Sequence, residues 1–384
     1  MKVKLSQAFD LQMGKTPSRN VAEYWGGDHK WVSIADIGSA GKYISSTKEC
    51  ITDEGISGSG IKAVPKGTVI MSFKLSIGKT AIASEDMYTN EAIMAFIDKG
   101  VYPVDPNYLY HLCCGTNWTA GTNKAVMGLT LNKATLSEKA ISLPTIQEQK
   151  EIAEKLDNVD VLINLRQCEL AKLDELVKSR FIELFGDSVT NSMGWDTDTV
   201  IGVCDDIYGG GTPSKSHPEY YENGDIPWVS SKDMKTDVLY TSQIKINQLG
   251  VDNSTAKMVP INSVIMVIRS GILKHTLPVA INAVPITVNQ DLKVFIPSKR
   301  ILSIFLMYQF KMLERDILSG VRAVTADNIE FDSLKKREII VPPMELQEQF
   351  VAFVEQTDKS KLAVQQALEK LETLKKSLMQ QYFG

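Results

Sequence analysis

The chain has 384 residues, 43% of them hydrophobic and 23% charged, with a mean hydropathy of −0.09, which is enough for two or more domains with their own cores. No stretch approaches the roughly 18 apolar residues of a membrane span, and the first residues lack the apolar segment of a signal peptide, so we expect a cytoplasmic protein. The net charge of −4 excludes a uniformly basic nucleic-acid-binding protein but leaves contacts by individually placed side chains open.

Residues 1–145 predict a first domain of short strands joined by turns. In chain order, WVSIAD, GTVIMSF and EAIMAFI are rich in apolar and β-branched residues, and clusters of Gly, Pro, Asn and Asp lie between them. The region carries 15 Lys and Arg against 13 Asp and Glu, a net charge of +2. Leu143-Pro144 then marks a place where a helix can begin but cannot extend backwards.

Residues 146–186 predict a long helix with one apolar seam. Apolar residues recur at alternating spacings of four and three, which is typical of a helix that packs along a second helix. About 35 helical residues span roughly 50 Å. The seam consists of Ile152, Leu156, Val159, Ile163, Leu170, Leu173, Val177 and Leu184.

The second half of the chain repeats the first. GKTPSRNVAEYWGGDHKWVSIAD at 14–36 recurs as GGTPSKSHPEYYENGDIPWVSSKD at 210–233. Other recurring blocks, in the same order, are VPKGTVIM and VPINSVIM, NEAIMAFI and NQDLKVFI, GTNKAV and SGVRAV, IQEQ and LQEQ, LAKLDELVKS and LEKLETLKKS, and Phe-Gly at the two helix ends. Seven paired blocks at offsets of 195 to 200 residues indicate a duplication.

The duplication predicts a second domain at 187–345 and a second long helix at 346–384. The seam of this helix contains Phe350, Val354, Val364, Leu368, Leu371 and Leu378. Because neither helix is apolar all round, each needs a partner for its seam, and the other helix is the simplest partner. The predicted fold is therefore α+β, with two duplicated mixed α/β domains held apart by a pair of long helices in a pseudo-twofold arrangement.

The sequence shows no recognisable catalytic or metal-binding pattern. The four histidines stand alone, and the five cysteines have no C-x-x-C spacing, so we expect reduced thiols and no metal. SIGKT at 76–80 is no phosphate-binding loop, because Phe73 occupies the place of the first glycine. Nucleophile-elbow, dinucleotide-binding and adenine-methyltransferase motifs are also missing. We expect a chain without its own catalytic site or cofactor.

Polar residues recur at equivalent loop positions of the two domains. Hydroxyl, amide and basic side chains of this kind can contact phosphate oxygens and base edges. The candidates in the first domain are Thr16, Ser18, Arg19, Lys74, Lys79, Asn90 and Lys124, and those in the second are Thr212, Ser214, Lys215, Arg269, Lys274, Asn289, Gln290 and Arg322.

Structural roles compete with DNA contact at several of these positions. The Gly-x-Thr-Pro-Ser loop can be a simple turn with a side-chain hydrogen bond, and Asn90 and Asn289 can cap local backbone. Trp31 and Trp228 fit a core better than a platform for bases. Lys74 and Arg269, which leave a strand beside Gly- and Ser-containing turns, are the stronger candidates for DNA contact.

The ordered and duplicated motifs resemble the specificity subunit of type I restriction-modification systems over the full length of the chain. The resemblance implies that 1–145 and 187–345 are target-recognition domains, each reading one half of a bipartite DNA site. It implies that 146–186 and 346–384 pair as an antiparallel coiled coil that sets the distance between the half-sites. It also implies two methyltransferase subunits, which bind S-adenosylmethionine and methylate adenine. Whether restriction subunits join them to hydrolyse ATP and cut DNA stays open.

Two other classes of protein stay open beside this one. A stand-alone enzyme would need a catalytic cluster that the motifs do not supply, and methylation by the purified chain alone would support it. A duplicated-domain scaffold or adhesion protein would show no dependence on DNA and would not co-purify with a methyltransferase.

Overall fold

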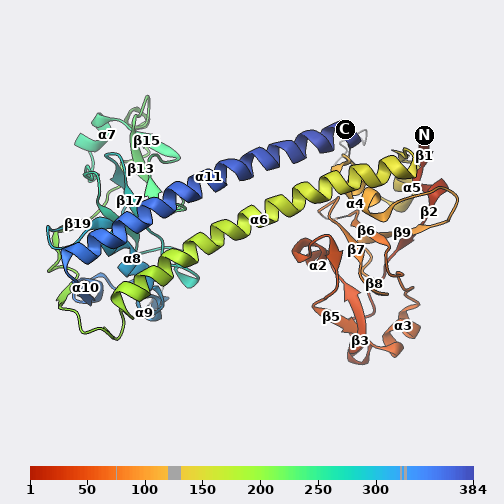
Figure 1. Cartoon of the computed structure of the whole chain (residues 1–384), viewed down its shortest axis with the longest axis horizontal. Coiled ribbons are helices and arrows are strands. Elements are labelled where there is room, and N and C mark those ends of the chain that lie inside the picture. The colour runs from red at the N-terminus through yellow and green to blue at the C-terminus, as the bar shows by residue number, and fades with distance from the viewer. Residues whose placement is uncertain (75, 120–130, 321, 324–326) are drawn as a thin grey trace. The chain divides into compact units, whose positions relative to one another are not determined.

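The computed structural model describes residues 1–74, 76–119, 131–320, 322–323 and 327–384 (Figure 1). It divides into two compact units, Met1–Gln167 with Gln366–Gly384 (unit 1) and Cys168–Gln365 (unit 2). Each unit holds one mixed α/β domain and a part of both long helices, α6 (Ile146–Phe185) and α11 (Met344–Phe383). No helix in the described residues is long and apolar enough to cross a membrane.

The domain of unit 1 is built on a five-stranded sheet with the order β2-β9-β6-β7-β4 and a three-stranded sheet with the order β5-β3-β8. The strands are β1 (Lys2–Lys4), β2 (Phe9–Met13), β3 (Trp25–Val32), β4 (Tyr43–Ile44), β5 (Glu49–Ile51), β6 (Val69–Ser72), β7 (Thr80–Ala83), β8 (Tyr88–Thr89), β9 (Ile93–Asp98) and β10 (Ala140–Ser142). The helices are α1 (Leu5–Ala8), α2 (Ile34–Ser39), α3 (Asp53–Ser59), α4 (Pro106–Gly115) and α5 (Lys133–Ser137).

The domain of unit 2 has the same two sheets, with the orders β12-β19-β16-β17-β14 and β15-β13-β18. Its strands are β11 (Thr197–Thr199), β12 (Cys204–Gly209), β13 (Ile226–Val229), β14 (Val238–Leu239), β15 (Ile244–Ile246), β16 (Val264–Val267), β17 (Val279–Asn282), β18 (Thr287–Val288), β19 (Leu292–Pro297), β20 (Arg322–Ala323), β21 (Asp327–Asn328) and β22 (Glu338–Ile340). Its helices are α7 (Gln248–Asp252), α8 (Ser303–Met312), α9 (Glu314–Ser319) and α10 (Phe331–Lys335). The matching strand orders confirm the predicted duplicated α+β fold.

The repeated Val-Ile-Met motif forms the central strand of each large sheet. All four residues of β6, VIMS, and of β16, VIMV, are buried. Each strand pairs antiparallel on both sides, with β7 and β9 in unit 1 and with β17 and β19 in unit 2. A short continuous apolar run is the pattern of a strand buried on both faces, so the motif belongs to the core.

A buried glutamine fixes the start of each long helix to its domain. Gln149 donates to the carbonyl oxygens of Pro103 and Pro144, both at 3.0 Å, and its Oε1 accepts from the Asp105 amide at 2.9 Å. Gln347 makes the equivalent bonds to the carbonyl oxygens of Arg300 (3.1 Å) and Pro342 (2.9 Å) and from the amide of Leu302 (2.9 Å). Both side chains are fully shielded from solvent. Because buried polar groups without partners cost free energy, these bonds hold each helix at one angle to its domain.

Each domain also packs against phenylalanine rings at the C-terminal end of a long helix, α6 in unit 2 and α11 in unit 1. In unit 2, Phe181 and Phe185 of α6 lie 5.5 and 4.8 Å from the ring of Phe305 in α8, and both also pack against Phe350 of α11. In unit 1, Phe383 of α11 lies 5.5 Å from the ring of Tyr108 in α4. Each domain is therefore packed against the first turns of one long helix and the last turns of the other.

The long helices run antiparallel within unit 2. From the end of α6 backwards, Phe185 contacts Phe350, Arg180 lies over the ring of Phe353, and Asp174 pairs with Lys361 at 2.7 Å. In unit 1, Asp160 of α6 pairs with Lys375 of α11 at 2.5 Å. Both lysines occupy places in the seam of α11 where a polar residue interrupts the apolar pattern, whereas each aspartate directly follows a seam residue of α6.

The predicted seam residues are shielded from solvent to different degrees. Fully or nearly fully buried are Leu156, Val159, Val177, Phe350, Val354, Val364 and Leu368. Half-buried are Ile152, Ile163, Leu170, Leu173, Leu184, Leu371 and Leu378. The exposed positions of both helices lie between them, as expected for one inward face.

Among the described residues, one anchoring cluster is found in unit 1 but not in unit 2. His111 of α4 is 1% exposed, and its Nε2 lies 2.7 Å from Oδ1 of Asp157 in α6. Lys42 donates to both carboxylate oxygens of Asp157 at 2.6 Å. Burial lowers the pKa of His111 more than the hydrogen bond to Asp157 raises it, which favours the neutral ring. The residue at the position of His111 in unit 2 is Tyr308, whose α8 neighbour Lys311 pairs with Asp237 instead.

Candidate nucleic-acid interface

The same side-chain contact joins two predicted motifs in both domains. Thr16 of the first Gly-x-Thr-Pro-Ser loop donates its hydroxyl to Oε2 of Glu91, which follows Asn90 just before β9. Thr212 donates in the same way to Oε1 of Gln290, just before β19. The partners lie 75 and 78 residues apart in the chain, so the sheet brings each pair together.

The glycine of this loop is required by the closeness of a neighbouring strand. A Cβ on Gly14 would lie 2.0 Å from the carbonyl oxygen of Thr89, and a Cβ on Gly210 would lie 1.9 Å from that of Val288. Neither distance can hold a carbon atom, so only glycine fits. The loop is thereby pressed against the strand that leads to Glu91 or Gln290.

A buried tryptophan holds the Gly-x-Thr-Pro-Ser loop by a hydrogen bond in each domain. Trp31 and Trp228 are 3% and 7% exposed, and their indole nitrogens donate to the carbonyl oxygens of Lys15 at 3.0 Å and Gly211 at 2.9 Å. The interpretation of both residues as core is confirmed. Their hydrogen bonds also tie the backbone of the loop to the indole rings.

Charged side chains gather around Glu91 in unit 1. The hydrogen bond from Thr16 lowers the pKa of Glu91 below its usual value, and the positive charges of Lys74 and Arg19 act in the same direction. Glu91 is therefore an exposed, ionised carboxylate at neutral pH. Arg19 lies 3.7 Å above the ring of Trp25 and forms a bidentate ion pair with Glu49, which holds its guanidinium in one orientation.

The equivalent place in unit 2 carries an arginine held by a different carboxylate. Arg269 donates from Nε to Oδ1 of Asp291 at 2.7 Å, and its Nη2 lies 2.6 Å from the same oxygen. The Arg269 side chain is 50% exposed, whereas that of Asp291 is 24% exposed. Asp291 directly follows Gln290 in the chain, so the carboxylate that holds Arg269 belongs to the residue after Gln290.

Several other predicted residues have local roles. Asn90 accepts from the amide of Ala92 at 3.0 Å, and Asn289 accepts from that of Asp291 at 3.2 Å, so both hold the turn before the strand. The Ser18 carbonyl accepts from the indole of Trp25 at 3.2 Å. Ser214 shares a hydrogen bond with Ser216 at 2.6 Å, as in a simple polar turn.

Among the described residues, the remaining candidates make none of the contacts given above for Thr16, Thr212, Arg19 and Arg269. Lys79 is exposed just before β7, Lys215 is exposed in the loop after Thr212, and Lys274 ends a short helical turn. Arg322 belongs to strand β20, while Lys124 lies outside the described residues. Glu91 and Asp291 are not among the predicted residues. The alignment of NEA with NQD pairs Glu91 with the predicted Gln290, and this pairing is the signal that points to it.

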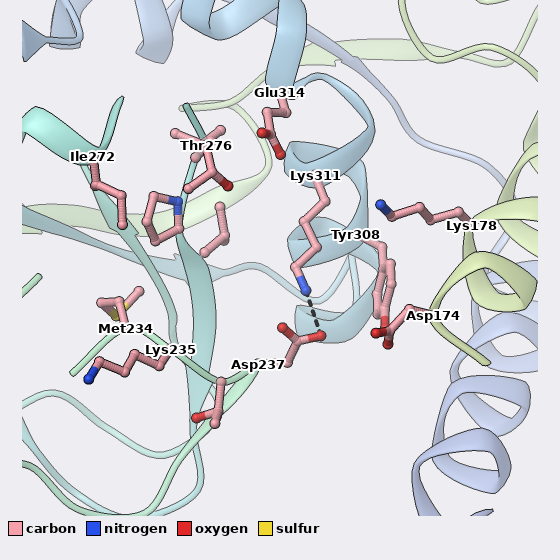
Figure 2. A pocket seen from close by; sticks show the side chains of 14 residues that line it. Asp174, Lys178, Met234, Lys235, Asp237, Ile272, Thr276, Tyr308, Lys311 and Glu314 are labelled. Carbon is pink, nitrogen blue, oxygen red and sulfur yellow. Dashed lines mark ion pairs between the residues drawn. The ribbon is translucent and has the colours of Figure 1, made fainter. Parts of the chain in front are cut away.

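A pocket of about 400 Å³ in unit 2 is lined by none of the candidate residues themselves (Figure 2). Side chains of α6, α8 and the loops before β14 and β17 line it, and Lys311 pairs there with Asp237 at 2.5 Å. Within the described ranges, no group of His, Cys, Asp and Glu could hold a metal ion. All five cysteines are free thiols.

Comparisons with known proteins agree over the length of the chain. The family described as type I restriction modification DNA specificity domain matches residues 1–175 and 193–374. The type I restriction enzyme MjaIX specificity subunit of Methanocaldococcus jannaschii is 25% identical over 374 residues, which cover 92% of this chain and 85% of that protein. The EcoR124I/EcoR124II specificity subunit of Escherichia coli is 37% identical over 155 residues, 40% of this chain and 38% of that protein.

Two solved structures share the fold. One is a chain from a study of complex assembly and conformational transition of the type I R-M system, with a TM-score of 0.64 and 20% identity over 100% of this chain and 97% of that one. The other is the S subunit of the type I restriction-modification system from M. genitalium, with a TM-score of 0.56 and 13% identity over 100% and 96% of the two chains. At these identities the likeness concerns the fold.

Proposed function

The chain belongs to the family of type I restriction-modification DNA specificity domains, and we propose on this premise that it is the non-catalytic DNA-reading subunit of a type I restriction-modification complex. The domain of each unit reads one half of a bipartite DNA site. The observation that carries this proposal is the repeated contact of Thr16 with Glu91 and of Thr212 with Gln290. The charges of Lys74 and Arg19 act on Glu91, and Arg269 pairs with Asp291, the residue after Gln290. Exposed polar side chains on rigid loops of this kind suit base and phosphate contacts.

The two half-sites differ in sequence. Equivalent positions carry Glu91 in unit 1 and Gln290 in unit 2, and these two side chains prefer different base edges. Two different recognition domains on one chain recognise an asymmetric DNA site, which explains why the duplicated domains have diverged.

The long helices dock two methyltransferase subunits. A duplicated scaffold offers two equivalent surfaces, which suits two copies of one partner. Leu176 and Leu374 occupy equivalent positions of the repeat and are 48% and 46% exposed, so each copy of the surface has the same apolar contact to offer. The partners bind S-adenosylmethionine, methylate adenine and supply much of the grip on phosphates. That division of labour agrees with a recognition domain at 187–345 whose 16 Lys and Arg face 19 Asp and Glu, a net charge of −3.

Mapping methylated adenines in cells with and without this chain tests the function directly. We expect one bipartite, asymmetric motif that is methylated only when the chain is present. An unchanged methylation pattern would contradict the proposal and would favour a scaffold that does not bind DNA.

The helices also set the spacer between the half-sites. Seven residues inserted between Ile163 and Leu170, with seven more between Lys361 and Leu368, keep the heptad phase and add about 10 Å of helix. Full transmission widens the spacer by about three base pairs, at about 3.4 Å each, and DNA bending reduces this to one or two. An active insertion variant with an unchanged spacer would show that the helices dock partners without setting distance.

A further inference from the structure

Glu91 and Gln290 occupy one structural position with two different chemistries. Each side chain is exposed and accepts a hydrogen bond from the threonine hydroxyl of the Gly-x-Thr-Pro-Ser loop in its own domain. Each lies two residues before the strand that pairs with the Val-Ile-Met strand. An exposed hydrogen bond of this kind contributes little to folding. Two domains that differ at most exposed positions nevertheless both make it, which indicates a role outside the fold.

The free atoms of the two side chains differ. Thr16 binds Oε2 of Glu91, which leaves Oε1 as a charged acceptor that cannot donate. Thr212 binds Oε1 of Gln290, which retains its second lone pair, and the two Nε2 hydrogens have no partner among the described residues. One domain therefore presents an acceptor alone, and the other presents a donor beside an acceptor.

A carboxylate is repelled by the phosphates of DNA, so its place on a DNA-facing surface needs a donor on a base edge. In the major groove that donor is an exocyclic amino group, and Glu accepts characteristically from cytosine N4. Lys74 and Arg19, whose charges act on Glu91, offset its repulsion from the backbone. A glutamine amide can bond both N6 and N7 of adenine.

Building on the proposed function, we propose that Glu91 reads a cytosine in one half-site and that Gln290 reads an adenine at the equivalent place in the other. Thr16 and Thr212 are positioning residues that aim these side chains into the major groove. The difference between the half-sites at this base pair then follows from one exchange between the two copies of the repeat.

Reciprocal exchanges in the full chain, assembled with its methyltransferase subunits, test the proposal. The complex selects bound DNA from a library that is randomised in both half-sites. Glu91→Gln changes the preference at one base pair of the first half-site from cytosine to adenine and reduces discrimination for cytosine roughly 5- to 150-fold. The second half-site is unaffected. Gln290→Glu produces the opposite change in the second half-site alone.

The positioning role has its own test. Thr16→Val keeps the shape of the side chain but removes the hydroxyl donor, so discrimination falls by roughly 5- to 10-fold at the same base pair that Glu91→Gln alters. Affinity for unrelated DNA stays the same. Glu85→Gln, which neutralises an exposed carboxylate paired with Lys30 in the same unit, serves as the matched control and changes no base preference.

Failure of the base-reading role of Glu91 can be distinguished from failure of the proposed DNA-recognition function. If the unaltered complex selects a bipartite site but Glu91→Gln leaves every base preference unchanged, the reading role is wrong and the function stands. An even rise in affinity for all sequences would also overturn the reading role, because Glu91 would then only repel phosphates. If the unaltered complex selects no sequence, the proposed function fails and the reading role falls with it.

Discussion

Unit 1 and unit 2 have identical residues at several buried positions, but they differ at the candidate interface and in part of the packing between each domain and the long helices. The buried glutamines Gln149 and Gln347 make the same three hydrogen bonds, and Trp31 and Trp228 support the same loop. Identical residues therefore mark the positions at which packing and hydrogen bonding allow only one solution.

The differences lie in two places. At the candidate interface, Lys74 and Glu91 of unit 1 correspond in the repeat to Arg269 and Gln290 of unit 2. Where the domain meets the long helices, unit 1 uses the His111–Asp157–Lys42 cluster, whereas unit 2 uses a cluster of phenylalanine rings. The two copies of the repeat have thus kept these buried contacts, while the residues of the candidate interface and part of the packing between domain and helix have diverged.

The largest effect is expected from the aromatic cluster of unit 2. Phe185 is fully buried against Phe305 and Phe350, so Phe185→Ala should destabilise unit 2 by about 3–5 kcal/mol. The equivalent Phe383 is only partly buried, and Phe383→Ala should cost about 1–2 kcal/mol by the lost contact area. Urea unfolding of the two variants measures both, and equal losses would contradict the described difference in packing.

The buried glutamines should instead behave alike. Gln149→Leu and Gln347→Leu each leave a buried amide N–H and carbonyl groups without a partner, at a cost of about 2–3 kcal/mol. Gln147→Leu, at an exposed position of the same helix, is the control and should change stability by less than about 0.5 kcal/mol. A loss in only one unit would show that the two helix anchors are not equivalent.

Arg269 and Lys74 should differ in DNA binding. Arg269→Ala should cost about 1–3 kcal/mol and relax specificity at one position if the guanidinium reads a base. Lys74→Ala should weaken binding evenly across sequences and reduce the salt slope by about one if the ammonium holds a phosphate. Titrations at several salt concentrations separate the two roles. Unchanged binding in both variants would remove these residues from the interface.

The smallest expected effect is a pH dependence confined to unit 1. Because burial holds the pKa of His111 below its usual value of 6.5, the unfolded chain binds a proton at a higher pH than the folded one. Its contribution to stability is therefore present above about pH 6.5 and is lost as the pH falls towards the lower folded-state pKa. His111→Gln, which cannot titrate, should flatten the unfolding profile of unit 1 below pH 6.5. A profile identical to that of the unaltered chain would exclude His111 as the source.

The repeat explains how much could be predicted from the sequence. Paired motifs revealed the duplicated domains, and the alternation of four and three revealed the seams, because packing along a helix imposes a period on the sequence. Thr16, Arg19 and Lys74 were found because they recur in both copies. Asp291 and the His111–Asp157 pair were not, because each depends on contacts between distant segments at positions where the two copies differ.

We propose that each unit reads its own half-site of the DNA. Replacing residues 1–145 with a second copy of residues 187–345 gives a chain with two identical recognition domains, one before each long helix. Sequencing of the methylated sites in cells that carry this variant should reveal a symmetric motif, an inverted repeat of the second half-site. Methylation that still requires the original first half-site, in a folded variant, would contradict the account.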